Sequence, residues 1–285
     1  GLSYRFKILR GEEENAIKIK ELSDFKSQLL TNITHEFRTP LTIIQGVSEL
    51  FQDSLENKIQ PKDIKEGYDA IERNSRSLLN LVNQMLDLAK LESKTTQLEL
   101  TQKDLIYVIQ NAVNSLSSGA KKKNISLVFE TGIPFLEMEL DEQKMHTILT
   151  NLISNAIKFT PEYGNIKVNL NTKQIEGKII DSIQISDTGK GISKEDLPNI
   201  FNRFFQPKSK TETTAGTGIG LSLVEELIAL MKGSINVSSK LGKGTIFTID
   251  LPRETSSSIN PNSIQKESKI GTVKEDDPFE LIDQK

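Results

Sequence analysis

The sequence predicts a multidomain protein in which an all-α segment precedes an α+β domain. Apolar residues in the N-terminal part of the chain recur at spacings of three and four, which is the period of amphipathic helices. From about residue 98, helical stretches alternate with short strand-like runs, a pattern typical of a mixed sheet that helices cover on one face. A polar break at 93–97 separates the two patterns.

The helical segment is expected to form a hairpin of two long helices. The first apolar stripe lies within 12–55, and a second follows a polar break at 56–61. The first consists of Leu22, Phe25, Leu29, Ile33, Phe37, Leu41, Ile44, Val47 and Phe51, and the second of Ile64, Tyr68, Ile71, Ser75, Leu78, Val82, Met85 and Ala89. Two helices make a poor core, so we expect two chains to form a dimeric four-helix bundle. The alternative is a helix pair that packs on the rest of its own chain.

The second domain is expected to alternate helices with strands. The expected helices lie near 103–118, 141–159 and 219–231, and the expected strands near 125–130, 135–140, 166–171, 179–186, 234–239 and 245–251. These patterns divide the chain into a signalling or linker helix (1–22), a helical hairpin (23–97), an α+β domain (98–253) and a flexible tail or linker (254–285).

Composition excludes several classes of function. The formal charge of −3 arises from 36 basic and 39 acidic residues, which argues against a nucleic-acid binder. The chain has no cysteine and therefore no disulfide or thiolate metal site, as is usual in the cytosol. No apolar run approaches the roughly 20 residues that a membrane helix needs. The start at Gly1 in a charged stretch suggests a piece of a longer protein.

A reactive cluster occupies the first expected helix, in the segment His35-Glu36-Phe37-Arg38-Thr39-Pro40. Thr39 lies four residues beyond His35, so both side chains share one face of the helix. Glu36 points about 100° away and reaches the imidazole by its rotamer or through water. Pro40 cannot donate to the carbonyl of Glu36, so we expect the helix to bend or loosen just after His35.

A polar helix face in the second domain could hold a metal and phosphates. Asn151, Asn155 and Lys158 fall on one face at i, i+4 and i+7. Amide oxygens could hold Mg²⁺ that keeps water and phosphate ligands, with the lysine near phosphate. An ordinary polar helix face is the alternative interpretation.

Two glycine-containing segments follow this helix. Asp187-Thr188-Gly189-Lys190-Gly191-Ile192 comes directly after an apolar run, where the acid could accept from an exocyclic amine, although a bare turn would look similar. Gly216-Thr217-Gly218-Ile219-Gly220-Leu221 opens a helix, whose N-H groups could face an anion, although a loop would also fit.

The polar stretch 194–215 between these segments suits a mobile lid, and Arg203 within it is a candidate phosphate clamp. Phe201, Phe204 and Phe205 are expected to be packing anchors. Gly242-Lys243-Gly244-Thr245 begins the last strand, where a hairpin turn is the simplest interpretation.

Taken in this order, the motifs resemble those of the sensor histidine kinases, over about 23–252. That resemblance implies a dimerisation and histidine-phosphotransfer domain followed by an α/β-sandwich ATP-binding domain of the histidine kinase/Hsp90-like type. It implies an ATP-dependent histidine autokinase in a two-component system, with ATP and Mg²⁺ as cofactors. Possible phosphatase activity towards the receiver is also implied, because Thr39 stands where some members place a water-positioning threonine.

The same resemblance assigns roles to residues. His35 would be the phosphoacceptor and Glu36 its acid-base partner. Asn155 would coordinate Mg²⁺, with Asn151 and Lys158 at the phosphates. Asp187 would receive the adenine amino group. The remaining nucleotide contacts would be Gly189, Gly191 and Thr245 around the base, and Gly216, Gly218, Gly220, Leu221 and Arg203 towards the phosphates.

The sequence disfavours three other functions. An ATP hydrolase or ATP-driven clamp on the same fold would resemble relatives with a glutamate four residues before the metal-binding asparagine, but that position is Asn151, which cannot act as a base. A zinc protease would need histidine where Thr39 stands, and His146 lacks ligand spacing. A scaffold with a dead nucleotide site is disfavoured because no motif looks degraded.

The resemblance also implies partners and a location. The expected partners are a second copy of the chain, through the hairpin, and the receiver domain of a response regulator, either separate or fused beyond Lys285 in a hybrid kinase. No nucleic acid is expected, and a membrane only through upstream segments. The chain would thus be the cytoplasmic portion of a membrane-anchored sensor, and the polar hinge at 93–97 would let the ATP-binding domain swing.

Overall fold

The computed structural model describes residues 20, 31, 33–52, 61–93, 96–206 and 218–253. The chain divides into two compact units, a helical one formed by 1–90 with 215–219, and an α+β one formed by 91–214 with 220–285. The expected signalling helix at 1–22, apart from residue 20, the hairpin loop and the tail at 254–285 lie outside the described residues.

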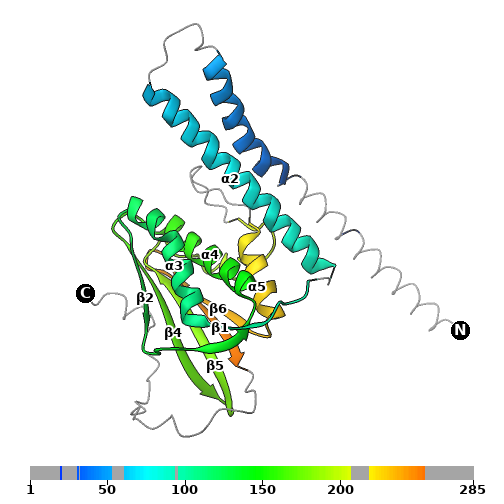
Figure 1. The fold of residues 1–285 in the computed structure, drawn as a ribbon, viewed down its shortest axis with the longest axis vertical. Helices are drawn as coiled ribbons and strands as arrows, with labels where there is room; N and C mark the ends of the chain where they lie inside the picture. Colours follow the sequence, from blue (N-terminus) through cyan, green and yellow to red (C-terminus); the bar gives the residue numbers. More distant parts are fainter. Residues whose placement is uncertain are drawn as a thin grey trace, which may run out of the picture. The chain divides into compact units, whose positions relative to one another are not determined.

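The helical unit contains the two expected helices. Residues 33–52 are helical, and α2 runs over Pro61–Glu92 (Figure 1). The two helices approach closely at Gly67 of α2, where an added Cβ would lie 2.5 Å from Phe51 and 2.9 Å from Val47. Glycine therefore sets the spacing of the hairpin at this point.

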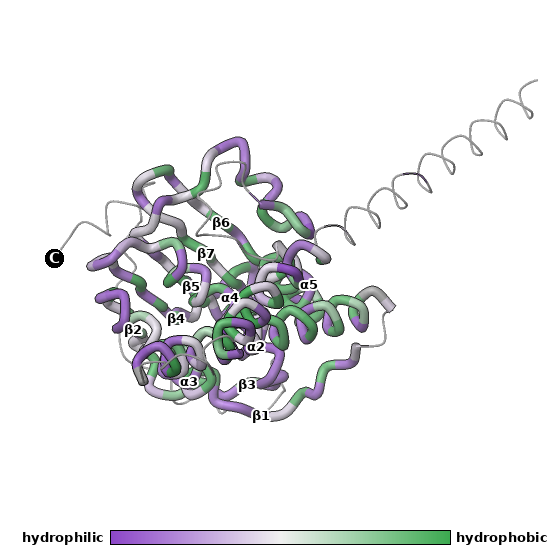
Figure 2. The backbone as a smooth tube through the Cα atoms, turned by 90° about the horizontal axis from the view of Figure 1, so that it is seen from above, coloured by the Kyte–Doolittle hydropathy of each residue, from purple (hydrophilic) through white to green (hydrophobic). Residues whose placement is uncertain are grey.

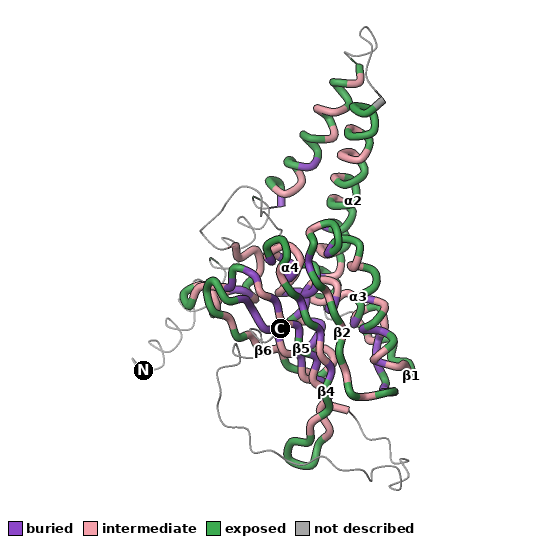
Figure 3. Tube along the Cα trace, turned by 90° about the vertical axis from the view of Figure 1, so that its left-hand side faces the viewer, coloured by how far each residue is buried: buried purple, intermediate pink, exposed green. Residues whose placement is uncertain are grey.

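Many apolar side chains of the helical unit remain exposed in the single chain. The large ones are Leu41, Ile43, Leu50, Ile64, Tyr68, Leu79, Val82 and Leu86. Figure 3 shows exposed and half-buried positions along most of α2, whereas buried positions gather in the α+β unit. An apolar surface of this kind is typical of a face that another protein surface covers.

The α+β unit is built on a five-stranded sheet with the strand order β2-β4-β5-β7-β6. Its strands are β2 (Ser126–Thr131), β4 (Asn165–Ile175), β5 (Lys178–Asp187), β6 (Ser234–Lys240) and β7 (Gly244–Arg253). The β2–β4 pair is parallel and the other pairs are antiparallel. A separate two-stranded sheet joins β1 (Thr101–Asp104) to β3 (Glu137–Leu140).

Three helices cover one face of the large sheet, as the sequence predicts. They are α3 (Leu105–Lys122), α4 (Glu142–Phe159) and α5 (Gly220–Leu230), and a short 3-10 turn, η1 (Leu197–Asn199), precedes α5. One core cluster includes Ile109 of α3, Leu149 of α4, Val224 of α5 and Ile185 of β5. The hydropathy of the strands alternates along the chain (Figure 2), so one face packs on the helices while the other is polar.

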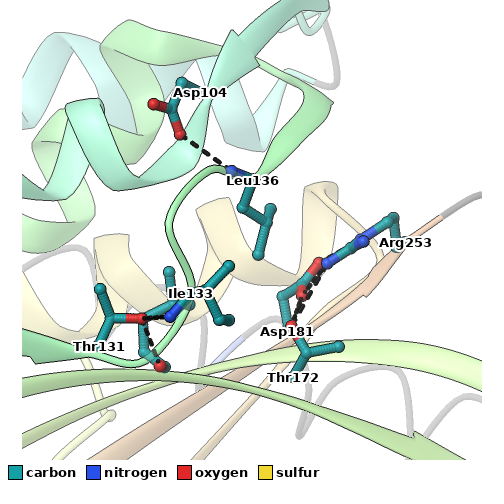
Figure 4. A network of polar contacts seen from close by, with 8 residues as sticks. Asp104, Thr131, Ile133, Leu136, Thr172, Asp181 and Arg253 are labelled. Carbon is teal, nitrogen blue, oxygen red and sulfur yellow. Dashed lines mark hydrogen bonds and ion pairs between the residues drawn. The ribbon is translucent and has the colours of Figure 1, made fainter. Parts of the chain in front are cut away.

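The start of α3 corrects the sequence-based expectation. A helix was expected from about residue 103, but 101–104 form β1, which pairs antiparallel with β3. Asp104 ends this strand and caps α3, because its Oδ1 accepts from the N-H groups of Ile106 at 3.0 Å and Leu136 at 3.3 Å (Figure 4). The pairing joins segments more than 30 residues apart, which a local pattern does not reveal.

A buried ion pair closes one end of the sheet. Asp181 of β5 is fully buried and receives the Arg253 guanidinium of β7, with Nε 2.8 Å from its Oδ2. The Thr172 hydroxyl of β4 donates to the Oδ1 of Asp181 at 2.7 Å. Figure 4 shows these three side chains joining three neighbouring strands. Both carboxylate oxygens of Asp181 are thereby satisfied.

Replacing Arg253 tests the contribution of this pair to stability. Arg253→Met leaves a buried carboxylate without its cation, so we expect the free energy of unfolding of the α+β unit to fall by about 3 kcal/mol. Arg76→Met provides a matched control, because its pair with Glu72 lies on the surface of α2 and should change stability by less than about 0.5 kcal/mol. Chemical denaturation measures both values, and equal effects of the two substitutions would contradict the assignment.

Candidate functional site

The His35 cluster lies on an uninterrupted helix. His35 and Thr39 are exposed on the helix that 33–52 form, and Glu36 is half-buried. The Thr39 hydroxyl donates to the carbonyl of His35 at 3.3 Å. Pro40 is buried, and the chain is helical on both sides of it, so the expected loosening does not break the helix. An exposed imidazole beside a carboxylate is thus available to a partner in solution.

The polar face of α4 lies in the α+β unit. Asn151, Asn155 and Lys158 are all half-buried. The Asn151 Nδ2 donates to the carbonyl of Thr147 at 2.8 Å, which orients the amide so that a Cβ added at Gly220 would lie 2.7 Å from its Oδ1. Glycine at position 220 therefore lets the first turn of α5 approach this face of α4.

Asp187 ends β5 at the opposite end of the strand from Asp181. It lies beside Thr245 of β7 in register and is only 7% exposed. Its Oδ1 accepts from the Gly189 N-H at 2.7 Å. Burial raises the pKa of Asp187 to about 6, although backbone hydrogen bonds from Gly189 and Thr245 lower it.

Backbone segments approach Asp187 too closely to admit side chains. A Cβ added at Gly189 would lie 2.6 Å from the Asp187 Oδ1 and 2.8 Å from the Phe159 carbonyl. A Cβ at Gly244 would lie 1.9 Å from the Asp187 carbonyl, and its φ of 123° is one that residues with a Cβ rarely adopt. The glycines therefore leave a buried carboxylate next to bare backbone, a form suited to a flat polar ring.

Two residues near Asp187 have contacts that the sequence did not reveal. Gly244 follows the β6–β7 hairpin turn, as the sequence predicts, but its approach to the Asp187 carbonyl depends on the register of β5 and β7. Ser239 was not singled out. Its hydroxyl lies 2.9 Å from that of Thr245 and accepts from the Ile192 N-H at 2.8 Å, so it ties β6 to the loop after β5. No local pattern distinguishes Ser239 from other serines, since its role arises from strand register.

The glycine-rich segment before α5 is described only in part. Gly216 lies outside the described residues. Gly218 adopts a positive φ of 66°, and Gly220 and Leu221 open α5. Of the expected lid at 194–215, residues 207–215 also lie outside them, whereas 194–206 are described.

Arg203 forms an ion pair with Glu226 of α5, and both side chains are partly buried. The expected phosphate clamp is therefore held against a helix of its own domain, where its guanidinium is engaged by a carboxylate. The expectation that it contacts phosphate stays a prediction.

Two family models match the chain in sequence order. The His Kinase A (phospho-acceptor) domain matches residues 25–94, and the model of histidine kinase-, DNA gyrase B- and HSP90-like ATPases matches residues 140–255. The chain belongs to the histidine kinases. The predicted family and fold class, a helical hairpin followed by an ATPase-type α/β domain, are thereby confirmed.

Individual relatives agree with this assignment. Histidine kinase P4 of Formosa agariphila is 36% identical over 239 residues, which cover 82% of this chain and 17% of that protein. The crystal structure of full-length ShkA in complex with AMPPNP is 30% identical, with a TM-score of 0.59, and the match covers 81% of this chain and 47% of that one. The chain therefore spans less than half the length of these two proteins.

A third relative is similar in fold. The structure of the histidine kinase ThkA in complex with response regulator protein TrrA is 24% identical, with a TM-score of 0.56, and the match covers 81% of this chain and 63% of that one.

Across the described part of the chain, no helix combines the length and apolar character needed to span a bilayer.

The raised pKa of Asp187 predicts a dependence of stability on pH. The unfolded carboxyl, with a pKa of 3.8, loses its proton before the native one does at about 6, so the native state binds more protons between these values. Ionisation of Asp187 therefore lowers the free energy of unfolding as the pH rises from about 4 to 6. Above pH 6 this contribution is constant.

Comparison with Asp187→Asn isolates this contribution from those of other groups. The difference in free energy of unfolding, variant minus wild type, should increase as the pH rises from 4 to 6 and then level off. Denaturant titrations at a series of pH values measure it. A difference that is flat across this range would contradict the burial argument.

Proposed function

We propose that this chain is the kinase core of an ATP-dependent histidine autokinase in a two-component system. It would transfer the γ-phosphoryl of Mg-ATP to His35, for onward transfer to an aspartate of a receiver domain. The observation that carries the proposal is that one chain contains an exposed His35, followed by the half-buried Glu36, on the hairpin and a buried Asp187 bordered by glycines in the α+β unit. The order of the two family matches supports it.

The pocket suits a nucleotide for chemical reasons. The Asp187 carboxylate keeps acceptor capacity that an exocyclic amino group of adenine could use, while Gly189 and Gly191 present backbone without side chains beside it and Thr245 lies next to it in register. Asn155, with Asn151 beside it, offers amide oxygen to Mg²⁺, and Lys158 lies one turn further along α4. A bound Mg²⁺ would neutralise charge on the β- and γ-phosphates.

The phosphate end of the site would use the start of α5. Gly216, Gly218 and Gly220, with Leu221, would offer backbone N-H groups to the phosphates, since the dipole of α5 favours an anion at its N-terminus. Arg203 would reach the γ-phosphate only by leaving Glu226, its ion-pair partner in this structure.

The transfer itself needs few groups. One imidazole nitrogen of His35 attacks the γ-phosphorus, forming an N–P bond as the bond to the bridging oxygen of ADP breaks and ADP leaves with the electron pair. Glu36 would accept from the other ring N-H, fixing the tautomer and stabilising the positive charge that develops on the ring. Positioning and charge neutralisation supply most of the rate enhancement in such reactions.

The hairpin would also serve as the dimer interface. The exposed apolar side chains along both helices, among them Leu41, Leu50, Tyr68 and Leu79, would be buried by a second copy in a four-helix bundle. The chain would act as the cytoplasmic portion of a membrane-anchored sensor, with any membrane contact made by segments upstream.

Its partner would be a receiver domain, separate or fused beyond Lys285. ThkA, a neighbour in fold, is known in complex with response regulator protein TrrA, which supports this class of partner. No nucleic acid is proposed.

An ATP hydrolase on the same fold is the weaker alternative. It would require a carboxylate base at the position of Asn151, whose amide instead donates to the Thr147 carbonyl at 2.8 Å. The amide cannot remove a proton from water, which favours transfer to histidine over hydrolysis.

Phosphoryl transfer can be tested with γ-labelled ATP and Mg²⁺. The wild-type chain should acquire acid-labile, alkali-stable label, whereas His35→Gln should acquire none, because the glutamine amide is not a nucleophile of comparable strength. Asn155→Ala should also remain unlabelled, through loss of metal-nucleotide binding. His146→Gln is the matched control, since it removes the other histidine, which is exposed on α4, and should be labelled as wild type. Label that survives in His35→Gln would overturn the proposal.

Replacing Thr39 should distinguish the two activities that the family resemblance implies, autophosphorylation and dephosphorylation of a receiver. Its hydroxyl is exposed one turn beyond His35, where it could position a water against a phosphorylated receiver. Thr39→Ala should retain autophosphorylation within about twofold and slow dephosphorylation of a phosphorylated receiver about tenfold or more. Unchanged dephosphorylation in this variant would remove Thr39 from that role.

A further inference from the structure

The ring of Phe159 holds two lysine side chains. The Lys158 Nζ lies 5.1 Å from the ring centroid, and the Lys190 Nζ lies 4.7 Å from it. Lys158 belongs to the last turn of α4, whereas Lys190 belongs to the loop after β5. Both distances are within the range of a cation-π contact, so the one ring of Phe159 contacts ammonium groups from two separate elements.

The backbone of Lys190 is fixed on both sides. Its N-H donates to the Phe159 carbonyl at 3.3 Å, and its carbonyl accepts from the Gly242 N-H at 2.7 Å. The next residue, Gly191, lies against the Lys240 carbonyl, which a Cβ would approach to 2.2 Å. Lys190 thus belongs to a loop that is anchored to α4 and to the β6–β7 turn. The backbone position from which its side chain extends is therefore fixed.

The charge of Lys190 is one that a bound anion could offset. The two ammonium groups lie within about 10 Å of each other through the shared ring, and like charges at that separation repel. No carboxylate among residues 96–206 and 218–253 forms an ion pair with Lys190. The phosphates of ATP are the anions that the proposed function would place near this ring.

The position of Lys190 indicates which phosphates it meets. Lys190 is three residues beyond Asp187, the proposed adenine acceptor, and shares its aromatic partner with Lys158, the proposed phosphate contact. Its nearness in sequence to the proposed base contact and its shared ring with the proposed phosphate contact favour the part of a bound nucleotide between the base and the terminal phosphate. The phosphates nearest the ribose occupy that part of a nucleotide.

We propose that Lys190 is a second cationic contact for the nucleotide, held on Phe159 beside Lys158 and acting on the α- and β-phosphates. The inference rests on the proposed function, because it takes ATP as the ligand of this pocket. Nothing in the glycine motif itself requires a cation here, since position 190 lies between two glycines that shape the backbone. The contribution is electrostatic, so it acts on affinity and leaves the transfer step unchanged.

Nucleotide binding by Lys190→Met tests the inference. Methionine keeps an unbranched apolar chain over the Phe159 ring and removes the charge. Dissociation constants for Mg-ATP, Mg-ADP and adenosine are measured by calorimetry at low salt. ATP and ADP should both weaken by the same factor, about threefold to tenfold, while adenosine binding is unchanged. In the labelling assay KM for ATP should rise and kcat should stay the same.

Three comparisons distinguish charge from packing. Lys190→Arg should restore wild-type affinity, because it restores the cation. Lys178→Met, at the exposed start of β5 and far along the strand from Asp187, should bind all three ligands as wild type does. The difference between Lys190→Met and wild type should shrink to less than about twofold in 0.5 M salt, where screening is strong.

The possible results separate this inference from the proposed function. A wild-type chain that binds neither ATP nor ADP would overturn both. Wild-type binding with an unchanged affinity in Lys190→Met would overturn the inference alone. An equal loss for adenosine, or a loss for ATP without one for ADP, would also overturn it, the first indicating a purely structural role and the second a contact with the γ-phosphate.

Discussion

The close approach of backbone to Asp187 is the constraint on which the candidate site of the α+β unit depends. The carbonyl of Asp187 lies where a Cβ at Gly244 would be, and Gly189 lies against both the Asp187 carboxylate and the end of α4. Three elements, β5, β7 and α4, therefore meet at one point without intervening side chains. That contact fixes the carboxylate beside the strand end and sets the distance from it to the polar face of α4.

Two aspartates on the same strand differ in how far their surroundings satisfy the carboxylate. Asp181 and Asp187 lie on the same, helix-facing side of β5, because they are an even number of residues apart. Asp181 is saturated by Arg253 and Thr172, so it joins strands and offers nothing to a ligand. Asp187 has only backbone N-H partners among the described residues, and burial raises its pKa to about 6. A buried carboxyl group without a side-chain partner can accept a hydrogen bond from a polar ligand.

The sequence predicted the helices and the strands of the main sheet, because these depend on local periodicity and on residues close together in the chain. It did not predict β1, Ser239 or the pairs Arg253–Asp181 and Arg203–Glu226, which arise where distant segments meet. The hairpin turn before Gly244 was predicted, but the close approach of this glycine to the Asp187 carbonyl was not, because it depends on the register of β5 and β7. The shared ring of Phe159 also becomes visible only when α4 and the loop after β5 are brought together.

The central claim is that a phosphoryl group from ATP comes to rest on His35. Localising the modified residue by mass spectrometry, with fragmentation that preserves N–P bonds, tests it most directly. After incubation of the wild-type chain with Mg-ATP, the account predicts a single phosphoryl group on the peptide that contains His35, assigned to the imidazole. A phosphoryl group found instead on Thr39, His146 or any serine, threonine or aspartate, with His35 unmodified, would contradict it.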